Sequence, residues 1–263
     1  MNFKAGYIQF CPDFCDPGKN IRKLDSLLKH AANADLIVIP ELANSGYNFQ
    51  THDQAVKSAE DIPNGPFTRF LIGMAKKLDL YIVAGINEKD NGKLYNSAVL
   101  VGPEGFLGKY RKIHLFMNEF DFFEKGDAGL PVFQIKGVKV GMLICFDWVF
   151  PEVWRILAMK GTDIICHPSN LVLPYAQQAV PVHGMINRTY CITANRYGTE
   201  HHVTFSGKSV ISDPLGKILC QAPEQQDEVK FIEFDLDLSK NKMITPKNHV
   251  FNDRRPEQYK GLV

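Results

Sequence analysis

Short apolar runs alternate along this chain with segments in which apolar residues recur at helical spacing. Residues 6–10 and 36–39 form two such runs, and Pro40 ends the second. Runs of this length, bounded by turn residues, predict buried strands. Between them, residues 20–30 carry apolar side chains at positions 21, 24, 27 and 28, which is the pattern of an amphipathic helix.

The alternation continues through the first hundred residues. A second amphipathic helix is predicted over 67–77, directly after the turn-forming sequence of residues 63–66. Residues 81–85 and 97–101 predict two paired strands, because Asp-Asn-Gly at 90–92 between them is a turn signal. The predicted order β-α-β-α-β-β is a doubly wound unit that ends in a hairpin.

The second half of the chain repeats the first. ADLIVIP at 34–40 corresponds to TDIICHP at 162–168, and VLVGPEG at 99–105 corresponds to VISDPLG at 210–216 with Pro and Gly aligned. Such self-similarity predicts two pseudo-symmetric sheet units, whose apolar faces all need a cover. We therefore expect an α/β fold, a four-layer αββα sandwich in which helices cover the outer faces and the two sheets pack on each other.

The composition is that of an ordinary globular protein. The chain has 263 residues, 45% hydrophobic and 22% charged, which is enough apolar material for a large core, and we expect a single domain over residues 1–263. Thirty Lys and Arg residues against 29 Asp and Glu give a formal charge of +1, without a basic block or an aromatic-interleaved basic stripe. This balance argues against a nucleic-acid partner.

The chain start and the cysteines bear on the cellular compartment. The sequence starts with a strand pattern, and it contains neither a basic-then-apolar leader nor an apolar run long enough to span a bilayer. Six scattered cysteines without paired C-x-x-C spacing suit reduced thiols better than a disulfide scaffold. We therefore expect a soluble cytoplasmic protein without a membrane partner, and no zinc site, because Cys11 and Cys15 lack a second pair.

Three polar side chains follow predicted buried strands at their carboxyl ends. Cys145 follows the run 140–144, Glu41 follows the run 36–39, and Asn170 follows the strand that repeats it. Open α/β sheets bind ligands at this edge, and helix-start amides beside a cysteine can favour a thiolate. Taken singly, however, a Cys at such a position is usually an inert core residue. A Glu at such a position is a loop carboxylate or a helix cap as often as it is a functional residue.

Lys112 follows the second strand of the first predicted hairpin, in the sequence GKYRKIHLF at 108–116. Most Lys and Arg residues in such a basic cluster are solvated. By itself Lys112 would therefore be interpreted as surface charge.

Three segments change these interpretations when they are taken together. They are IPEL at 39–42, YRKIHL at 110–115, and GMLICFD at 141–147 with FPE at 150–152. In order and spacing they resemble the glutamate, lysine and cysteine motifs of the nitrilase superfamily of carbon–nitrogen hydrolases, and the resemblance covers nearly the whole chain. It implies the αββα sandwich, no metal or organic cofactor, and a catalytic triad of Glu41, Lys112 and Cys145.

The resemblance also implies a second glutamate, seven residues before a Gly-Asp pair that lies between the lysine and cysteine motifs. Counting back from Gly126 and Asp127 leads to Glu119. Glu124 lies in the same acidic segment and competes for this assignment. The sequence leaves both candidates open.

These residue types belong together because an amide carbonyl is a poor electrophile. Cys145 would attack the carbon, and Glu41 would accept the thiol proton, deliver it to departing ammonia and then activate the water that hydrolyses the thioester. The Lys112 ammonium and the backbone N–H of Phe146 would hold the tetrahedral oxygen, and one such donor commonly lowers the barrier by about 3 to 4 kcal/mol. Glu119 would orient Lys112 or the substrate amide.

Other side chains near the motifs are candidates for the substrate pocket. They are Tyr47, Phe146, Trp148 and Asn170. The alternative for Trp148 is core packing, and Asp147 beside it is either a pocket residue or a helix cap before Pro151.

The histidines form no competing motif. His114, His167, His183, His201 and His202 lack HExxH and H-x-x-x-H spacing, so we expect neither a Cys–His hydrolase nor a metal site. We interpret His167 as a satisfied interior imidazole and the pair His201-His202 as a polar turn.

These residues and the resemblance predict an amidase that hydrolyses a small carboxamide to a carboxylate and ammonia through a cysteine thioester. A nitrilase would use the same triad through a thioimidate, and an N-carbamoyl amidohydrolase would accept a ureido group. The alternative of a different class is a non-catalytic scaffold, against which the intact motifs argue. The acyl group stays open, because a hydrophobic pocket separates one methylene by only about 1 to 3 kcal/mol.

The C-terminal residues 239–263 are polar, with isolated apolar side chains and no helical period. This pattern predicts an extended arm. The family resemblance implies a homodimer or larger homo-oligomer in which such an arm packs over the partner, and the alternative is an arm that lies on its own subunit.

Overall fold

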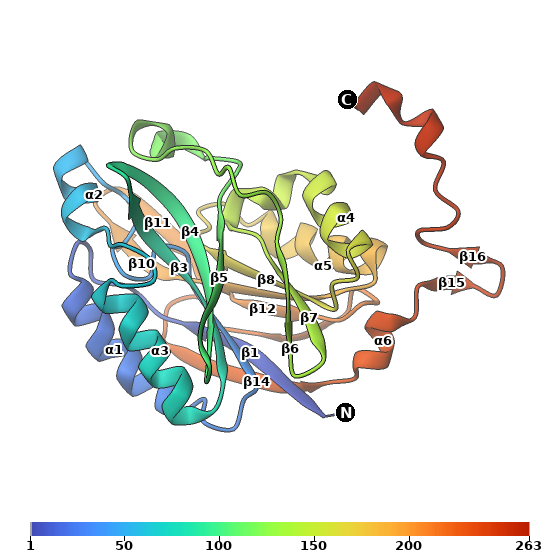
Figure 1. Ribbon diagram of the computed structural model, residues 1–263, viewed down its shortest axis with the longest axis horizontal. Helices are drawn as coiled ribbons and strands as arrows, with labels where there is room; N and C mark the ends of the chain where they lie inside the picture. The colour runs from blue at the N-terminus through green and yellow to red at the C-terminus, as the bar shows by residue number, and fades with distance from the viewer. Residues whose placement is uncertain (1, 263) are drawn as a thin grey trace.

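Two six-stranded mixed sheets form the centre of the computed structural model, which describes residues 2–262 (Figure 1). The first sheet contains, in spatial order, β14 (Glu228–Phe234), β1 (Phe3–Gln9), β2 (Leu36–Ile39), β3 (Tyr81–Asp90), β4 (Lys93–Gly102) and β5 (Gly105–Arg111). The second contains β13 (Ile218–Gln221), β12 (Val210–Ser212), β9 (Tyr190–Asn195), β8 (Ile164–Ser169), β7 (Val138–Met142) and β6 (Val132–Ile135). Each sheet has a parallel triplet of strands flanked by antiparallel ones.

The two sheets share one topology, as the sequence repeat predicts. β2 and β8 contain most of the repeated segments 34–40 and 162–168, and each is the middle strand of its parallel triplet. The other repeated segments, 99–105 and 210–216, begin in β4 and β12. Each of these two strands adds antiparallel to the third strand of the parallel triplet in its own sheet. The prediction of two pseudo-symmetric halves is therefore confirmed.

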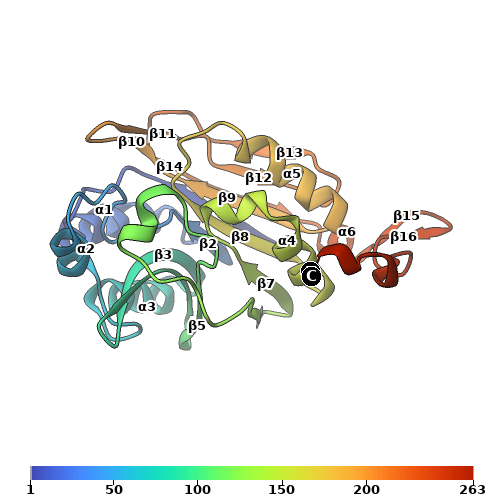
Figure 2. The ribbon, with the colours of Figure 1, turned by 90° about the horizontal axis from the view of Figure 1, so that it is seen from above.

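Helices cover the outer faces of the sheets and complete four layers (Figure 2). The first sheet is covered by α1 (Pro17–Lys29) and α3 (Pro66–Leu78), and the second by α4 (Pro151–Met159) and α5 (Ala176–Asn187). Outside these layers lie α2 (His52–Ser58) beside β3, α6 (Leu236–Lys240) after β14, and a hairpin of β10 (Tyr197–Glu200) and β11 (Val203–Ser206). The predicted αββα sandwich is confirmed.

Both faces of the central strands are buried, which explains why these strands have unbroken apolar sequences. In β2, Val38 packs between the two sheets in one cluster with Val140 of β7. Its neighbours Ile37 and Ile39 point the other way and pack with Leu24 of α1. Successive side chains of a strand alternate between its faces, so a strand that is covered on both sides needs apolar residues throughout.

The predicted elements are present, with shifted ends. The helix predicted over 20–30 begins at Pro17, because proline suits the first helical position and the Asp16 carboxylate caps the helix by accepting from the backbone N–H of Lys19 at 2.9 Å. The hairpin of β3 and β4 turns at 90–92, as predicted. The strands of this hairpin extend well beyond the predicted ranges, since their pairing continues to the turn.

The chain after α6 leaves the two sheets as an arm (Figure 1). The arm contains β15 (Met243–Thr245), β16 (Asn248–His249) and two 3-10 turns, η3 (Pro256–Gln258) and η4 (Lys260–Leu262). The Lys242 ammonium donates to the carbonyl of Arg188 at 2.7 Å, and the Arg188 guanidinium donates to the carbonyl of Met243 at 3.2 Å. The arm thus contacts the end of α5 in its own subunit. Two predictions remain predictions: that the arm lies at a subunit interface, and that residues 1–263 form a single domain.

The cysteines and the helix lengths bear on two further expectations. All six cysteines are free, in agreement with the expected reduced thiols. The helices α1 and α3 have 13 residues each, and no helix in the described part of the chain could cross a membrane.

Candidate active site

Glu41 lies at the carboxyl end of β2, directly after Pro40, and its side chain is fully buried. Its backbone packs against Gly85 of β3, where a β-carbon would lie 2.3 Å from the Glu41 α-carbon. Only glycine permits this approach. The backbone N–H of Gly85 donates to the Pro40 carbonyl at 3.1 Å and that of Ala43 donates to the Gly85 carbonyl at 2.8 Å. The close packing therefore fixes the position of the glutamate backbone.

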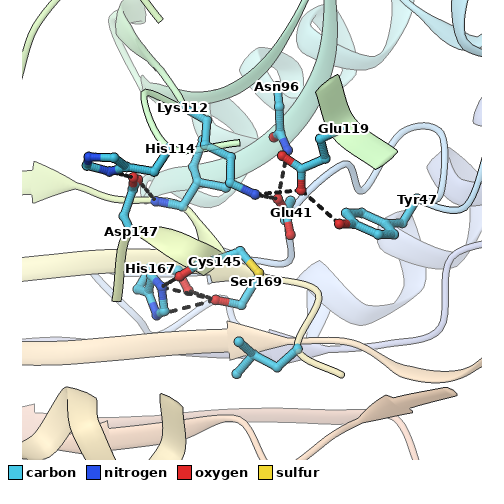
Figure 3. A network of polar contacts seen from close by, with 12 residues as sticks. Glu41, Tyr47, Asn96, Lys112, His114, Glu119, Cys145, Asp147, His167 and Ser169 are labelled. Carbon is cyan, nitrogen blue, oxygen red and sulfur yellow. Dashed lines mark hydrogen bonds and ion pairs between the residues drawn. The ribbon is translucent and has the colours of Figure 1, made fainter. Parts of the chain in front are cut away.

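Lys112 follows β5 and meets Glu41 inside the protein (Figure 3). Its ammonium is enclosed and donates to Oε1 of Glu41 and to Oε1 of Glu119, each at 2.7 Å. The Asn96 side-chain amide donates to the same Glu41 oxygen, also at 2.7 Å. The interpretation of Lys112 as solvated surface charge is therefore wrong, because two carboxylates compensate for the burial of its charge.

The structure distinguishes the two candidates for the second glutamate. Glu119 lies in the 3-10 helix η1 (Met117–Asp121), is 3% exposed, and accepts from Lys112 at 2.7 Å and from the Tyr47 hydroxyl at 2.8 Å. Glu124 is exposed to solvent. Glu119 is therefore the glutamate that contacts the lysine.

Cys145 begins the 3-10 helix η2 (Cys145–Val149), shortly after β7. Its φ of 41° lies in the left-handed region, which a non-glycine residue adopts only when its surroundings hold it there. The ring Nε2–H of His167 donates to the Cys145 carbonyl at 2.8 Å and helps to hold the turn. The cysteine is 4% exposed, and Figure 3 shows its sulfur beside Glu41, whose charge acts on the thiol.

His167 of β8 supports the cysteine backbone and does not contact the thiol as a base would. Its Nε2 is committed to the Cys145 carbonyl, so Nδ1 accepts from the Thr193 hydroxyl at 3.1 Å. Burial lowers the pKa of His167 to about 4, so the ring is neutral near pH 7. The interpretation as a satisfied interior imidazole is confirmed. Across residues 2–262, no group of three or more His, Cys, Asp or Glu side chains is placed to hold a metal ion.

Burial and charge set the protonation of the thiol and the ammonium. Burial raises the pKa of the Cys145 thiol well above its usual value, Glu41 raises it further, and Lys112 opposes the shift. The resting cysteine is therefore a protonated thiol, because burial outweighs the groups that favour a thiolate. Burial would lower the pKa of Lys112, but the charges of Glu119 and Glu41 outweigh burial and raise that pKa, so the ammonium stays charged.

Glu119 ionises closer to neutral pH than an ordinary glutamate. Burial raises the pKa of Glu119 to about 7, and the neighbouring Glu41 charge adds to the rise. The charge and hydrogen bond of Lys112 and the hydrogen bond from Tyr47 act in the opposite direction. This carboxyl group is thus able to change its charge near neutral pH.

Asp147 ties the cysteine turn to the lysine motif. Its carboxylate accepts from the backbone N–H of Ile144 and from the Tyr110 hydroxyl, each at 2.8 Å, and lies 2.7 Å from Nδ1 of His114. The alternative of a cap for the helix that begins at Pro151 is wrong, because α4 starts after Phe150 without a side-chain cap, and Asp147 caps η2 instead through its bond with Ile144. Since Tyr110 and His114 belong to the lysine motif, Asp147 holds two distant segments of the sequence in register.

The predicted substrate-binding residues line two adjoining spaces. Phe146, Trp148 and Asn170 line a cleft of about 30 Å³ together with Cys145. Asn170 is 2% exposed, and neither polar atom of its side-chain amide has a hydrogen-bond partner among the described residues. Tyr47 lines a separate cavity of about 320 Å³, to which Glu119 also contributes.

A buried ion pair holds the Tyr47 segment in place. The Glu200 carboxylate accepts from the backbone N–H groups of Tyr47 at 2.9 Å and Asn48 at 2.8 Å, and it binds the buried guanidinium of Arg196. Neither charged residue was expected from the sequence. Their opposite charges four residues apart are the only local signal, and this spacing is common on protein surfaces.

Sequence comparison connects this site with known proteins. The sequence profile described as carbon–nitrogen hydrolase matches residues 4–241. The chain belongs to this family. Among other carbon–nitrogen hydrolases, it is 49% identical over 258 residues to the nitrilase of Pyrococcus abyssi, covering 97% of this chain and 98% of that protein. It is 32% identical over 284 residues to the N-carbamoylputrescine amidase of Arabidopsis thaliana, covering 97% and 93%.

Solved structures of this superfamily share the fold. XC1258 from Xanthomonas campestris, a CN-hydrolase superfamily protein, superposes with a TM-score of 0.83 at 22% identity, covering 91% of this chain and 93% of that one. The Nesterenkonia AN1 amidase of the nitrilase superfamily has a TM-score of 0.81 at 22% identity, covering 99% and 97%. The resemblance to the nitrilase superfamily inferred from the three motifs is confirmed.

Proposed function

We propose that this carbon–nitrogen hydrolase is an amidase that converts a small carboxamide to a carboxylate and ammonia, with Cys145 as its nucleophile. The observation that carries the proposal is a pair of buried oxygens, Oε2 of Glu41 and Oε2 of Glu119, that have no hydrogen-bond partner within residues 2–262. A carboxamide brings two N–H donors to such acceptors, whereas a nitrile nitrogen has none. Since unpaired buried acceptors are costly, the site favours an amide.

The first half of the proposed reaction forms a thioester. Cys145 attacks the amide carbon, and Glu41 accepts the thiol proton, which burial keeps on the resting sulfur. The developing oxyanion is stabilised by the Lys112 ammonium and by the backbone N–H of Phe146, and one such donor lowers the barrier by about 3 to 4 kcal/mol. The protonated Glu41 then returns the proton to nitrogen as the C–N bond breaks, and ammonia leaves.

The second half hydrolyses the thioester. Water attacks the acyl carbon while Glu41 accepts one of its protons, and the C–S bond then breaks as a proton passes to the sulfur. Glu119 holds Lys112 in position throughout, and the Tyr47 hydroxyl holds Glu119. The cycle consumes one amide and one water and restores the Cys145 thiol.

A nitrilase is the second candidate, because the 49% identical relative from Pyrococcus abyssi is a nitrilase. The same thiol would add to the nitrile carbon to form a thioimidate, and two waters would then complete hydrolysis to carboxylate and ammonia. A ureido substrate is the third, because a 32% identical relative is an N-carbamoylputrescine amidase. Both candidates use the Cys145 chemistry described above. A nitrile offers no N–H donor to the two buried carboxylate oxygens, whereas a ureido group offers N–H donors of its own.

Ammonia release from matched substrates tests the proposal. The purified protein is given amides and nitriles with the same acyl group, together with carbamoyl compounds, and Cys145→Ala serves as the control. We expect kcat/KM for each amide to exceed that of its nitrile by roughly tenfold or more, and the variant to release no ammonia. Faster turnover of nitriles would establish the second candidate instead. Equal, slow release by wild type and variant across the whole panel would support a non-catalytic binding protein.

We also propose that two copies of the chain associate through α4 and α5. Five large apolar side chains are exposed on these helices: Ile156, Met159, Val182, Met185 and Ile186. Exposed apolar patches of this kind mark protein–protein interfaces. The C-terminal arm borders the same surface, where it and α4 line a groove of about 590 Å³. A second copy would therefore cover the patch and the groove together.

A further inference from the structure

A cavity of about 320 Å³ adjoins the cysteine cleft. Six apolar side chains form much of its wall: Phe49, Phe116, Phe122, Phe123, Val172 and Leu173. Phe116, Val172 and Leu173 also line the cysteine cleft. Because the two spaces share these three residues, a substrate whose reacting carbon lies at the thiol can extend the rest of its acyl group into the larger cavity.

The ionisable side chains that line the cavity lie at its two ends. Glu119 and Phe49 lie at its buried floor, being 3% and 2% exposed, whereas Leu173 and His202 lie at its exposed rim. No Lys or Arg of the described residues lines it. Glu119, the only carboxylate among the described residues that line it, accepts two hydrogen bonds at the catalytic centre through Oε1. The other polar residues of its wall, Tyr47, Asn48, Asn118 and Thr204, are uncharged, so between Glu119 and His202 the wall offers no opposite charge to a charged chain.

We propose, on the basis of the amide hydrolysis proposed above, that this cavity is the acyl-chain subsite and that it selects small, uncharged apolar acyl groups such as a branched alkyl chain or a phenyl ring. Its volume is at the lower end of the range for ligand pockets, which limits the acyl group to a small one. Each methylene of the acyl chain that is buried against the six apolar side chains raises kcat/KM about fourfold.

A charged acyl chain is rejected because its charge would be desolvated without a partner. A terminal carboxylate would lie among phenylalanine side chains with no cation in reach. For a terminal ammonium Glu119 is not available, because Lys112 binds its Oε1 and the reacting amide proposed above binds its Oε2. His202 at the rim stays in solvent, where its interaction with a charged chain is screened.

Two pairs of amides of equal shape test the charge preference. 4-Methylpentanamide has the shape of succinamate with an isopropyl group in place of the carboxylate, and pentanamide has the shape of 4-aminobutanamide with a methyl group in place of the ammonium. We expect kcat/KM to be at least about 100-fold higher for the uncharged member of each pair. We also expect it to rise from acetamide through butanamide to pentanamide.

A variant at the rim tests whether this cavity causes the preference. Leu173→Arg places a guanidinium at the cavity mouth, and we expect it to reduce the ratio of 4-methylpentanamide to succinamate activity at least about tenfold. Leu215→Arg is the matched control, because Leu215 is similarly exposed, 54% against 46%, and lines neither the cavity nor the cleft. The control should leave the ratio unchanged.

The outcomes separate this inference from the proposed function. Faster hydrolysis of succinamate or 4-aminobutanamide than of its uncharged counterpart would overturn the apolar subsite and leave the amidase in place. An equal change of the ratio in both arginine variants would also overturn it, because the effect would then be one of overall charge. Release of ammonia from none of these amides would overturn the proposed function itself.

Discussion

Lys112 and Glu119 are joined by a hydrogen bond of 2.7 Å between Nζ and Oε1, in a site that excludes solvent from both side chains. The same ammonium binds Glu41 at the same distance, so one cation serves two carboxylates. Burial raises the pKa of Glu119 to about 7. The charge of Glu119 therefore changes near neutral pH.

Glu119→Gln should remove an ionisation from the pH dependence of activity. In the wild type, kcat/KM should rise as pH increases through about 7, because the carboxylate form of Glu119 positions Lys112 and Tyr47. We expect the variant to lose roughly 100-fold in kcat and to lack this inflection. Steady-state kinetics across that pH range measure both effects. Glu124→Gln, on an exposed glutamate of the same loop, is the control and should keep the wild-type profile.

Glu41→Gln should slow thioester formation strongly without unfolding the protein. Since the resting Cys145 thiol is protonated, its attack depends on a base. The glutamine keeps the shape of the side chain but cannot accept the proton, and we expect acyl-enzyme formation to slow by about 10² to 10⁴-fold. Mass spectrometry of the acyl-enzyme after rapid quenching measures this step. Retained activity in the variant would remove Glu41 from the role of base.

His167 should make the folded protein less stable in acid. Burial lowers its pKa from the ordinary 6.5 to about 4. The folded chain thus binds this proton more weakly than the unfolded chain does, so the stabilisation is present above about pH 6.5 and is lost as pH falls toward 4. The difference corresponds to about 3 kcal/mol in the free energy of unfolding.

Urea unfolding of wild type and His167→Asn at neutral and acidic pH checks this prediction. We expect the wild type to lose more unfolding free energy on acidification than the variant does, because asparagine does not titrate. His202→Asn, at an exposed position, is the control and should behave as the wild type. Equal losses in wild type and His167→Asn would assign the acid sensitivity to other groups.

Glu200→Gln should act on catalysis through the position of Tyr47. The substitution weakens the acceptor for two backbone N–H groups and leaves the buried Arg196 without its anionic partner, which costs about 3 to 5 kcal/mol in stability. It should also lower kcat, because Tyr47 then holds Glu119 less firmly. A double-mutant cycle with Tyr47→Phe measures the coupling. We expect the double variant to lose clearly less activity than the product of the single losses, whereas independent losses would restrict Glu200 to a role in stability.

Removal of the arm should dissociate the proposed dimer. A variant that ends at Leu238 lacks the residues that border the apolar face of α4 and α5. We expect sedimentation to show dimers for the full chain and monomers for the variant. An unchanged dimer would mean that the arm is not essential for association, and a monomeric full chain would contradict the proposed interface.

Local sequence was sufficient for the αββα layers, the two equivalent halves and the strand ends that carry Glu41 and Cys145. Strands that are buried on both faces need unbroken apolar residues, and strand ends in parallel sheets meet at one edge, so both features can be read along the chain. The three family motifs then identified Lys112, which by local pattern alone belongs on the surface.

Contacts between distant segments decided the rest. Glu119 and Glu124 are alike in the sequence, and only the fold buries the first against Lys112 and exposes the second. The protonated resting thiol and the Arg196–Glu200 support of Tyr47 have the same origin. Burial and charge act through space, so the protonation and the partners of a side chain depend on residues that the fold brings to it from elsewhere in the chain.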